Sequence, residues 1–195
     1  MRIHLFILVV FLVVSAAHPT RADEAQSRRP FGGKEHAIPG KIEAEHYDEG
    51  KPGEAYHDVD EKNHGANYRG VTQVDIEKRD DASGGHGVGW TKAGEWVTYS
   101  VVVKESGNYD VKFVLSAPSK GGVIHLDFNG KDATGPIAVP NTGSFQTLGS
   151  VVKKKVPLKA GEYVMKMVMD ANGKSGYVAD IDSIEFLPAA PASAQ

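Results

Sequence analysis

The apolar residues of this chain recur with a period of two, and this feature limits its fold more than any other. Successive side chains of a β-strand point to opposite faces of a sheet, so this period is typical of strands with one buried face. The stretches that alternate in this way, or are rich in β-branched and aromatic residues, are 96–103, 108–115, 123–128, 145–152, 163–169 and 181–187. No long stretch carries a helical period. The pattern therefore predicts an all-β protein.

Turn residues separate these stretches. Asn129-Gly130 follows residues 123–128 directly, and this dipeptide favours a tight hairpin because both of its residues tolerate a positive φ. The 22 glycines of the chain include several that punctuate the other stretches. Many short strands at roughly even spacing predict a two-sheet antiparallel β-sandwich of the jelly-roll type.

The N-terminus predicts the compartment. Arg2 precedes a continuous apolar run over 5–14, and small residues follow it, as in a secretory signal peptide. We expect a signal peptide over 1–22, with cleavage after Ala22 favoured over cleavage after Ala17. The alternative is an uncleaved anchor, although the apolar run is shorter than the roughly 20 residues of a membrane span. The mature protein is then secreted, extracellular or periplasmic, and free of the membrane.

Composition limits the remaining possibilities. Residues 23–37 are polar and without periodicity, and residues 188–195 contain mainly Pro, Ala and Ser, so we expect a flexible leader and a disordered tail around one domain at 38–187. The chain has no cysteine, which excludes disulfides, thiol catalysis and thiolate metal sites. A formal net charge of −3 with no basic stripe argues against a nucleic-acid partner. We expect a monomer.

A series of short motifs along residues 38–187 resembles carbohydrate-binding module family 6. In chain order these motifs are Ile42-Glu43-Ala44-Glu45, Ala55-Tyr56-His57-Asp58, Asn67-Tyr68-Arg69, Val74-Asp75-Ile76, Gly87-Val88-Gly89-Trp90, Gly94-Glu95-Trp96, Thr142-Gly143-Ser144-Phe145 and Asp182-Ser183-Ile184. The resemblance implies a β-jelly roll that binds a polysaccharide or oligosaccharide without catalysis and holds a structural calcium.

The resemblance also implies which residues touch the sugar. A pyranose packs its C–H face on an aromatic ring, and its hydroxyls need fixed hydrogen-bond partners. By analogy with the family, the two aromatic positions are Tyr68 and Phe145, the amide position is Asp180, and Glu54 adds a polar contact. Phe145 stands where the family usually has Trp, and Asp180 where it usually has Asn, so binding is expected to be weaker or altered.

Other roles for these residues stay open. Tyr68 and Phe145 can serve as core residues instead, and Glu54 as a solvated loop carboxylate. A second glycan site on the concave face of one sheet is known in such modules, but no motif locates it here. Trp90 and Trp96 are the alternative sugar platforms, although we expect core packing for both.

Glu43 and Glu45 are two residues apart on an expected strand, so their carboxylates share a face and repel each other unless a cation neutralises them. The resemblance adds Asp182 at the start of the last strand. We expect these residues to bind calcium, which prefers oxygen ligands, and so to join the first strand to the last.

Catalytic motifs are weak: neither Gly-x-Ser-x-Gly nor His-Glu-x-x-His occurs. The main prediction is therefore a secreted, non-enzymatic module for a plant, algal or microbial polysaccharide. One alternative is a small jelly-roll polysaccharide hydrolase or lyase. The other is a structural sandwich whose sugar site has decayed.

Overall fold

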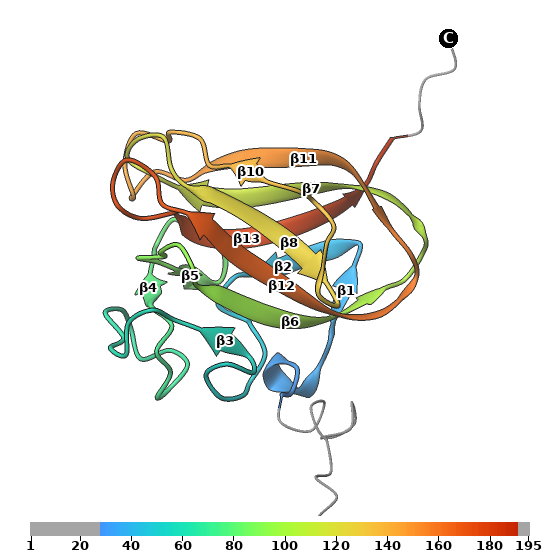
Figure 1. Ribbon diagram of the computed structural model, residues 1–195, viewed down its shortest axis with the longest axis horizontal. Coiled ribbons are helices and arrows are strands. Elements are labelled where there is room, and N and C mark those ends of the chain that lie inside the picture. Colours follow the sequence, from blue (N-terminus) through green and yellow to red (C-terminus); the bar gives the residue numbers. More distant parts are fainter. Residues whose placement is uncertain (1–27, 191–195) are drawn as a thin grey trace, which may run out of the picture.

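The computed structural model describes residues 28–190, and these form two β-sheets packed face to face (Figure 1). The strands are β1 His36–Ile38, β2 Gly40–Glu43, β3 Tyr56–His57, β4 Ile76–Lys78, β5 His86–Val88, β6 Trp96–Val103, β7 Gly107–Ser116, β8 Val123–Phe128, β9 Lys131–Asp132, β10 Ile137–Ala138, β11 Gly149–Leu158, β12 Gly161–Ala171 and β13 Asp180–Pro188. Two short 3-10 turns, Phe31–Gly33 and Ser83–Gly85, complete the regular structure. The predicted all-β jelly-roll sandwich is confirmed.

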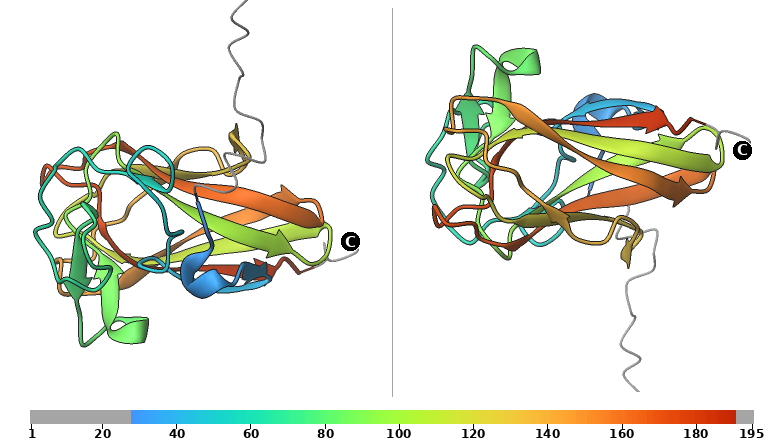
Figure 2. Two further views of the ribbon diagram at one scale, coloured as in Figure 1. Left: turned by 90° about the horizontal axis from the view of Figure 1, so that it is seen from below. Right: turned by 90° about the horizontal axis from the view of Figure 1, so that it is seen from above.

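One sheet has seven strands in the order β1-β6-β12-β8-β10, with β3 beside β6 and β9 beside β8. The other has six strands in the order β11-β7-β13-β5-β4, with β2 beside β13. Every pairing between named strands is antiparallel except that of β1 with β6. Loops from distant parts of the chain meet at one end of the sandwich, where the segment around β3, β4 and β5 lies (Figure 2).

The core between the sheets is built from the alternating apolar residues of the long strands. β8 shows the rule in its burial, since Ile124, Leu126 and Phe128 are buried and the residues between them are half-buried. Phe128 meets Phe186 of the other sheet edge to face, with ring centroids 6.3 Å apart. Complete burial of one such ring contributes roughly 1.5–3 kcal/mol, and the core of this chain, which has no cysteine, is built from many such side chains.

Several sequence boundaries agree with the structure. Residues 96–103 and 123–128 are β6 and β8, and Asn129 and Gly130 have φ of 53° and 77°, as a tight hairpin turn requires. The stretch predicted at 145–152 differs, because β11 begins only at Gly149. Residues 144–147 form a loop in which the Ser144 hydroxyl contacts that of Thr147 at 2.9 Å.

The N-terminal part of the described chain also differs from the expected leader at 23–37. Residues 36–38 form β1, which pairs in parallel with residues 101–103 of β6. Arg28 makes an ion pair of 3.1 Å with Asp48, whose side chain is fully buried. A buried carboxylate needs a cation or hydrogen bonds, and this need fixes Arg28 against the sandwich. The expected signal peptide, residues 23–27 and residues 191–195 lie outside the described residues.

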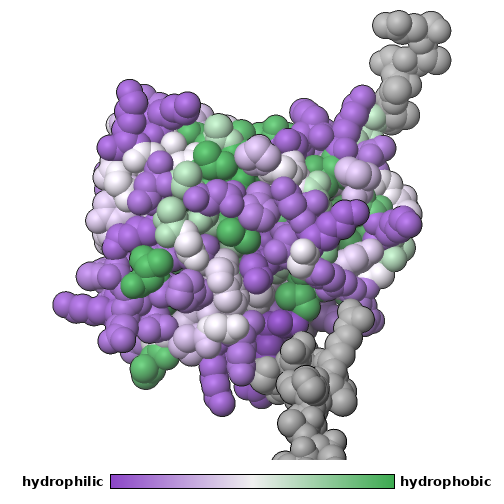
Figure 3. Space-filling view, in the orientation of Figure 1, coloured by the Kyte–Doolittle hydropathy of each residue, from purple (hydrophilic) through white to green (hydrophobic). Residues whose placement is uncertain are grey.

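No helix in residues 28–190 is long and apolar enough to cross a membrane. Figure 3 shows a mainly hydrophilic face on which apolar side chains form small, separate patches.

Candidate functional site

A cavity of about 100 Å³ opens at the loop end of the sandwich, and six residues from strands and loops line it. They are Glu77, Trp90, Phe145, Gln146, Tyr177 and Asp180. We call this cavity the loop-end cleft. β5 pairs with both β4 and β13, so it brings Glu77 of β4 and Trp90 beside Asp180, the first residue of β13. The loop from β10 to β11 adds Phe145 from the opposite side.

Trp90 is held at the cleft in an unusual backbone conformation. Its φ is 50°, a region that bulky residues rarely adopt and that costs on the order of 1–3 kcal/mol. The Trp90 N–H donates a hydrogen bond of 3.0 Å to Oδ1 of Asp180, which offsets part of this strain. A side chain at Gly89 would approach the same Asp180 oxygen to 3.3 Å, so the glycine leaves room for this contact. The indole is half-buried and lines the cleft.

Phe145 and Tyr177 provide further aromatic surface. Their rings meet edge to face, with centroids 6.0 Å apart, and both side chains are half-buried. Gln146 beside them is exposed and offers both a donor and an acceptor. Rings at the wall of a cleft, with polar groups between them, match the needs of a pyranose.

Asp180 provides the most enclosed polar group of the cleft, since it is only 7% exposed. Burial raises the pKa of its carboxyl to about 7, and the nearby charge of Glu77 raises it further, while the Trp90 N–H and Arg79 oppose the rise. Asp180 is therefore partly protonated near neutrality and can donate a hydrogen bond as well as accept one.

The structure brings only part of the expected sugar site together. Phe145 and Asp180 line the loop-end cleft as expected, but Tyr68 and Glu54 do not. Tyr68 is 39% exposed and stacks on His86 with centroids 4.1 Å apart, while its hydroxyl contacts His46 Nε2 at 3.0 Å. The aromatic residue across the cleft from Phe145 is Trp90, which sequence reasoning treated as structural.

Glu77 was also missed. It directly follows Ile76 in the motif Val74-Asp75-Ile76, and the alternation there was a usable signal, because a buried Ile76 turns Glu77 to the other face. The sequence did not show that this face borders a cleft.

Glu54 lies instead in a larger groove of about 820 Å³ on the outer face of the seven-stranded sheet. We call this the sheet-face groove; it is lined by Arg28, Gly53, Glu54, Trp96, Thr98, Asp127, Asn129, Gly130, Val164 and Lys166. Lys166 places its ammonium 4.2 Å from the ring centroid of Trp96. Trp96 is half-buried and turned to this groove, so it is not the core residue that the sequence predicted. One oxygen of Glu54, Oε2, is buried without a hydrogen-bond partner in residues 28–190.

The three expected calcium ligands lie around Ser83 and Gly84. Ser83 donates its hydroxyl to Glu43 at 2.6 Å and its N–H to Asp182 at 2.7 Å. Glu43 ends β2, but Glu45 lies in the turn that follows, where the His46 N–H bonds to the Glu43 carbonyl, so the two do not share a strand. Glu45 still reaches the same place, because a side chain at Gly84 would meet its Oε1 at 3.0 Å.

Glu45 has the chemistry and burial of a cation ligand. Both carboxylate oxygens of Glu45 are buried and have no hydrogen-bond partner in the described part of the chain. Burial raises the pKa of Glu45 to about 7, and the charges of Glu43 and Asp182 add to the rise. No three His, Asp or Glu side chains of residues 28–190 are arranged as a group that could hold a metal ion, and the Ser83 hydroxyl lies between Glu43 and Asp182. Two unpaired buried oxygens are nevertheless what a hard cation would satisfy.

The comparison with known proteins agrees with this fold. A segment of 111 residues is 30% identical to the clotting factor G alpha subunit of Tachypleus tridentatus. This segment covers 54% of this chain but only 16% of that protein. A β-1,3-glucan-binding family 6 module from Bacillus halodurans has a TM-score of 0.59 and 23% identity, covering 79% of this chain and 99% of its own. The C-terminal family 6 module of a marine laminarinase from Zobellia galactanivorans has a TM-score of 0.57 and 25% identity, covering 76% of this chain and 98% of its own.

The family model covers most of the sandwich. The model of carbohydrate-binding module family 6 matches residues 64–188, well over half of the chain, and this range contains every residue of the loop-end cleft. The chain therefore belongs to carbohydrate-binding module family 6.

Proposed function

We propose that this protein is a non-catalytic module that binds a neutral polysaccharide in the loop-end cleft. The observation that carries the proposal is the convergence of Trp90, Phe145 and Tyr177 with two carboxylates in one cavity. The rings supply flat apolar surface for a sugar face, and the carboxylates accept hydrogen bonds from its hydroxyls.

The charge of the cleft favours a neutral glycan over an anionic one. Its titratable lining groups include the acids Glu77 and Asp180, and no cationic side chain is among its lining residues. A uronate or sulfate group placed there would meet like charges at close range, which costs free energy.

The names of similar structures support β-glucans as the first ligands to test. The similar module from Bacillus halodurans is described as β-1,3-glucan binding, and a module from Cellvibrio mixtus was solved with cellotriose. A single open site of this kind binds weakly, with a dissociation constant on the order of 10 μM to 1 mM.

We further propose secretion, directed by residues 1–22, and a structural calcium held by Glu43, Glu45 and Asp182. The calcium would bridge the end of β2 and the start of β13, which are already paired between Ser183 and Glu43. Its role is structural, since the loop-end cleft contains none of these three residues.

The protein is proposed to bind the glycan without cleaving it, and a reducing-end assay distinguishes binding from hydrolysis. Glu77 and Asp180 both contact Arg79, with Nη1 3.0 Å from Glu77 Oε2 and 3.7 Å from Asp180 Oδ2. Arg79 thus offsets only part of the negative charge of the two acids, since it also pairs with Asp81, and Asp180 is little exposed to water. New reducing ends from laminarin, at a rate that Glu77→Gln abolishes, would establish a hydrolase instead.

The sheet-face groove is a second candidate glycan site, because an aromatic ring and several polar side chains line it. Trp96 offers a platform, and the Glu54 side chain lines the same groove beside Asp127 and Asn129, which can bond to sugar hydroxyls. Its larger volume suits several sugar units along a chain. Trp96→Ala tests this groove, as Trp90→Ala tests the loop-end cleft.

The deciding experiment is native affinity electrophoresis in gels containing laminarin, lichenan, xylan or alginate. Retardation by a neutral polymer that Trp90→Ala abolishes supports the proposal. Retardation that only Trp96→Ala abolishes moves the site to the sheet-face groove. No retardation of the folded wild-type protein by any polymer leaves a structural sandwich as the better description.

A further inference from the structure

A single buried arginine, Arg79, lies behind the loop-end cleft and touches several of the elements that form it. It follows β4 by one residue, and its side chain is only 4% exposed. It is not among the cleft-lining residues, so it does not reach the cavity itself. We propose that Arg79 is the positioning residue of the cleft, fixing the main chain at Phe145 and the carboxylate of Glu77 where a glycan needs them; this inference rests on the proposed function.

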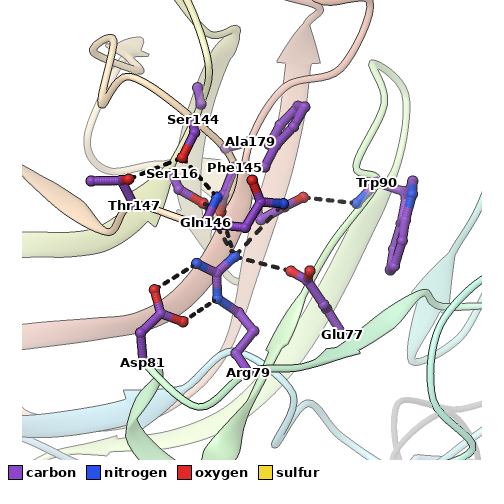
Figure 4. A network of polar contacts seen from close by, with 12 residues as sticks. Glu77, Arg79, Asp81, Trp90, Ser116, Ser144, Phe145, Gln146, Thr147 and Ala179 are labelled. Carbon is purple, nitrogen blue, oxygen red and sulfur yellow. Dashed lines mark hydrogen bonds and ion pairs between the residues drawn. The ribbon is translucent and has the colours of Figure 1, made fainter.

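The guanidinium connects two sides of the cleft. On one side, Nη1 donates a hydrogen bond of 2.7 Å to the carbonyl of Phe145. On the other, the same Nη1 donates at 3.0 Å to Oε2 of Glu77. Figure 4 shows the guanidinium between these groups, with Trp90 and Glu77 on one side and the loop of residues 144–147 on the other. Arg79 thus sets the distance between the Glu77 carboxylate and the Phe145 main chain.

Arg79 is itself held in place by Asp81. Nε and Nη2 of Arg79 donate to the two oxygens of Asp81 at 3.0 and 2.9 Å, a bidentate pair. This geometry needs the planar fork of a guanidinium, and a lysine ammonium cannot reproduce it while also reaching Phe145 and Glu77. The position therefore requires arginine and not only a positive charge.

The loop that carries Phe145 depends on this contact. Thr142 joins the base of the loop to Ala117, but the other hydrogen bonds within residues 143–147 are short-range, such as Gln146 N–H to the Ser144 hydroxyl at 3.2 Å. The Phe145 carbonyl is bound to the six-stranded sheet by Arg79 and by the hydroxyl of Ser116 at 2.6 Å. Losing Arg79 leaves one of these two bonds, so the loop gains freedom that glycan binding must then remove.

The experiment compares three variants with the wild-type protein by titration calorimetry with laminarin oligosaccharides. Arg79→Met removes the charge and the donors, and Arg79→Lys keeps the charge alone. Arg69→Met is the matched control, because Arg69 also bonds to main-chain carbonyls, those of Glu45 and Tyr47 at 2.6 and 2.8 Å, but lies outside the cleft. We expect about tenfold weaker binding for Arg79→Met, a several-fold loss for Arg79→Lys, and less than twofold change for Arg69→Met.

A double-mutant cycle distinguishes positioning from a general loss of stability. If Arg79 acts through Phe145, then Arg79→Lys weakens binding several-fold in the wild type but little further in Phe145→Ala. Equal losses in both backgrounds would overturn the proposal. If Arg79→Met does not fold, the lysine variant still gives this result.

Amide hydrogen exchange of residues 143–147 tests the inference without any glycan. Arg79→Lys should speed exchange in this loop by about tenfold or more, whereas Arg69→Met should not. If the wild-type protein binds no glycan, the proposed function fails, and faster exchange still supports the role of Arg79 in placing the loop. Unchanged exchange together with unchanged affinity in Arg79→Lys would overturn the role of Arg79 while leaving glycan binding intact.

Discussion

The main-chain N–H of Trp90 bonds to the side-chain carboxylate of Asp180 at 3.0 Å, so the aromatic platform and the most buried acid of the cleft are fixed to each other. The two residues come from distant parts of the chain and meet because β5 pairs with β13. This one bond holds a tryptophan with positive φ at the edge of the cavity.

The first prediction concerns the identity of the stacking residue. Trp90→Ala removes the ring at the cleft, and we expect glycan affinity to fall at least about tenfold, because stacking on one ring contributes on the order of 1 kcal/mol or more. Tyr68→Ala should change affinity less than about twofold, since that ring stacks on His86 outside the cleft. Calorimetric titration of both variants measures this. A larger loss of affinity in Tyr68→Ala than in Trp90→Ala would place the binding site at Tyr68.

The second prediction concerns Asp180. Asp180→Ala leaves the Trp90 N–H without its acceptor, so the strained backbone relaxes, and affinity should fall about five- to tenfold. Asp180→Asn keeps an acceptor oxygen and should bind within about threefold of the wild type. Melting temperatures of both variants serve as the folding control. Equal loss in both variants would mean that the charge, and not the hydrogen bond, is what the cleft requires.

The third prediction concerns calcium. Calcium that binds only the folded protein raises its melting temperature, by an amount that grows with the logarithm of the free ion concentration. We expect a chelator to lower the melting temperature by several degrees, and Glu45→Gln to abolish this difference. Asp170→Asn, on the other sheet beside His125, is the matched control and should keep the calcium response. A wild-type protein that melts at the same temperature with calcium and with chelator would contradict the site.

The fourth prediction concerns pH and Glu95, which is 7% exposed. Burial raises the pKa of Glu95 to about 7 from its ordinary 4.5. The charges of Asp58 and Asp75 raise this pKa further, while the hydrogen bond from the Lys92 N–H lowers it. Between about pH 4.5 and 7 the folded protein keeps a proton that the unfolded chain has lost, so stability falls as pH rises through this window.

Glu95→Gln cannot ionise and should remove this part of the fall. Urea unfolding at several pH values measures the free energy of unfolding. Between pH 4.5 and 7 this free energy should rise in the variant, relative to the wild type, by up to about 3 kcal/mol. Wild-type and variant curves that stay parallel through this window would show that Glu95 titrates normally.

The sequence predicted the strands better than the cleft, for a physical reason. Alternation along residues 96–103 and 123–128 records burial of one face, and it gave β6 and β8 with their bounds. Phe145 and Asp180 were expected at one site from the resemblance, and both line the same cavity. Loop residues carry no such period, so Tyr68 and Glu54 were assigned to a cleft that they do not line.

Trp90 and Arg79 show what the sequence could not reveal. A positive φ at a tryptophan has no local signal, because such a conformation depends on contacts like the one with Asp180. Arg79 contacts Phe145, 66 residues away, and Ser116, 37 residues away, so its role exists only once the sheet has formed.

The parallel strand β1 has a practical consequence for anyone who shortens this protein. β1 covers residues 101–103 of β6, and Arg28 neutralises the buried Asp48. A version that starts at residue 39 would expose an unpaired strand edge of valines, which other chains can join, and would leave a buried carboxylate without its cation. We therefore expect residues 28–38 to limit aggregation, and a soluble fragment to include them.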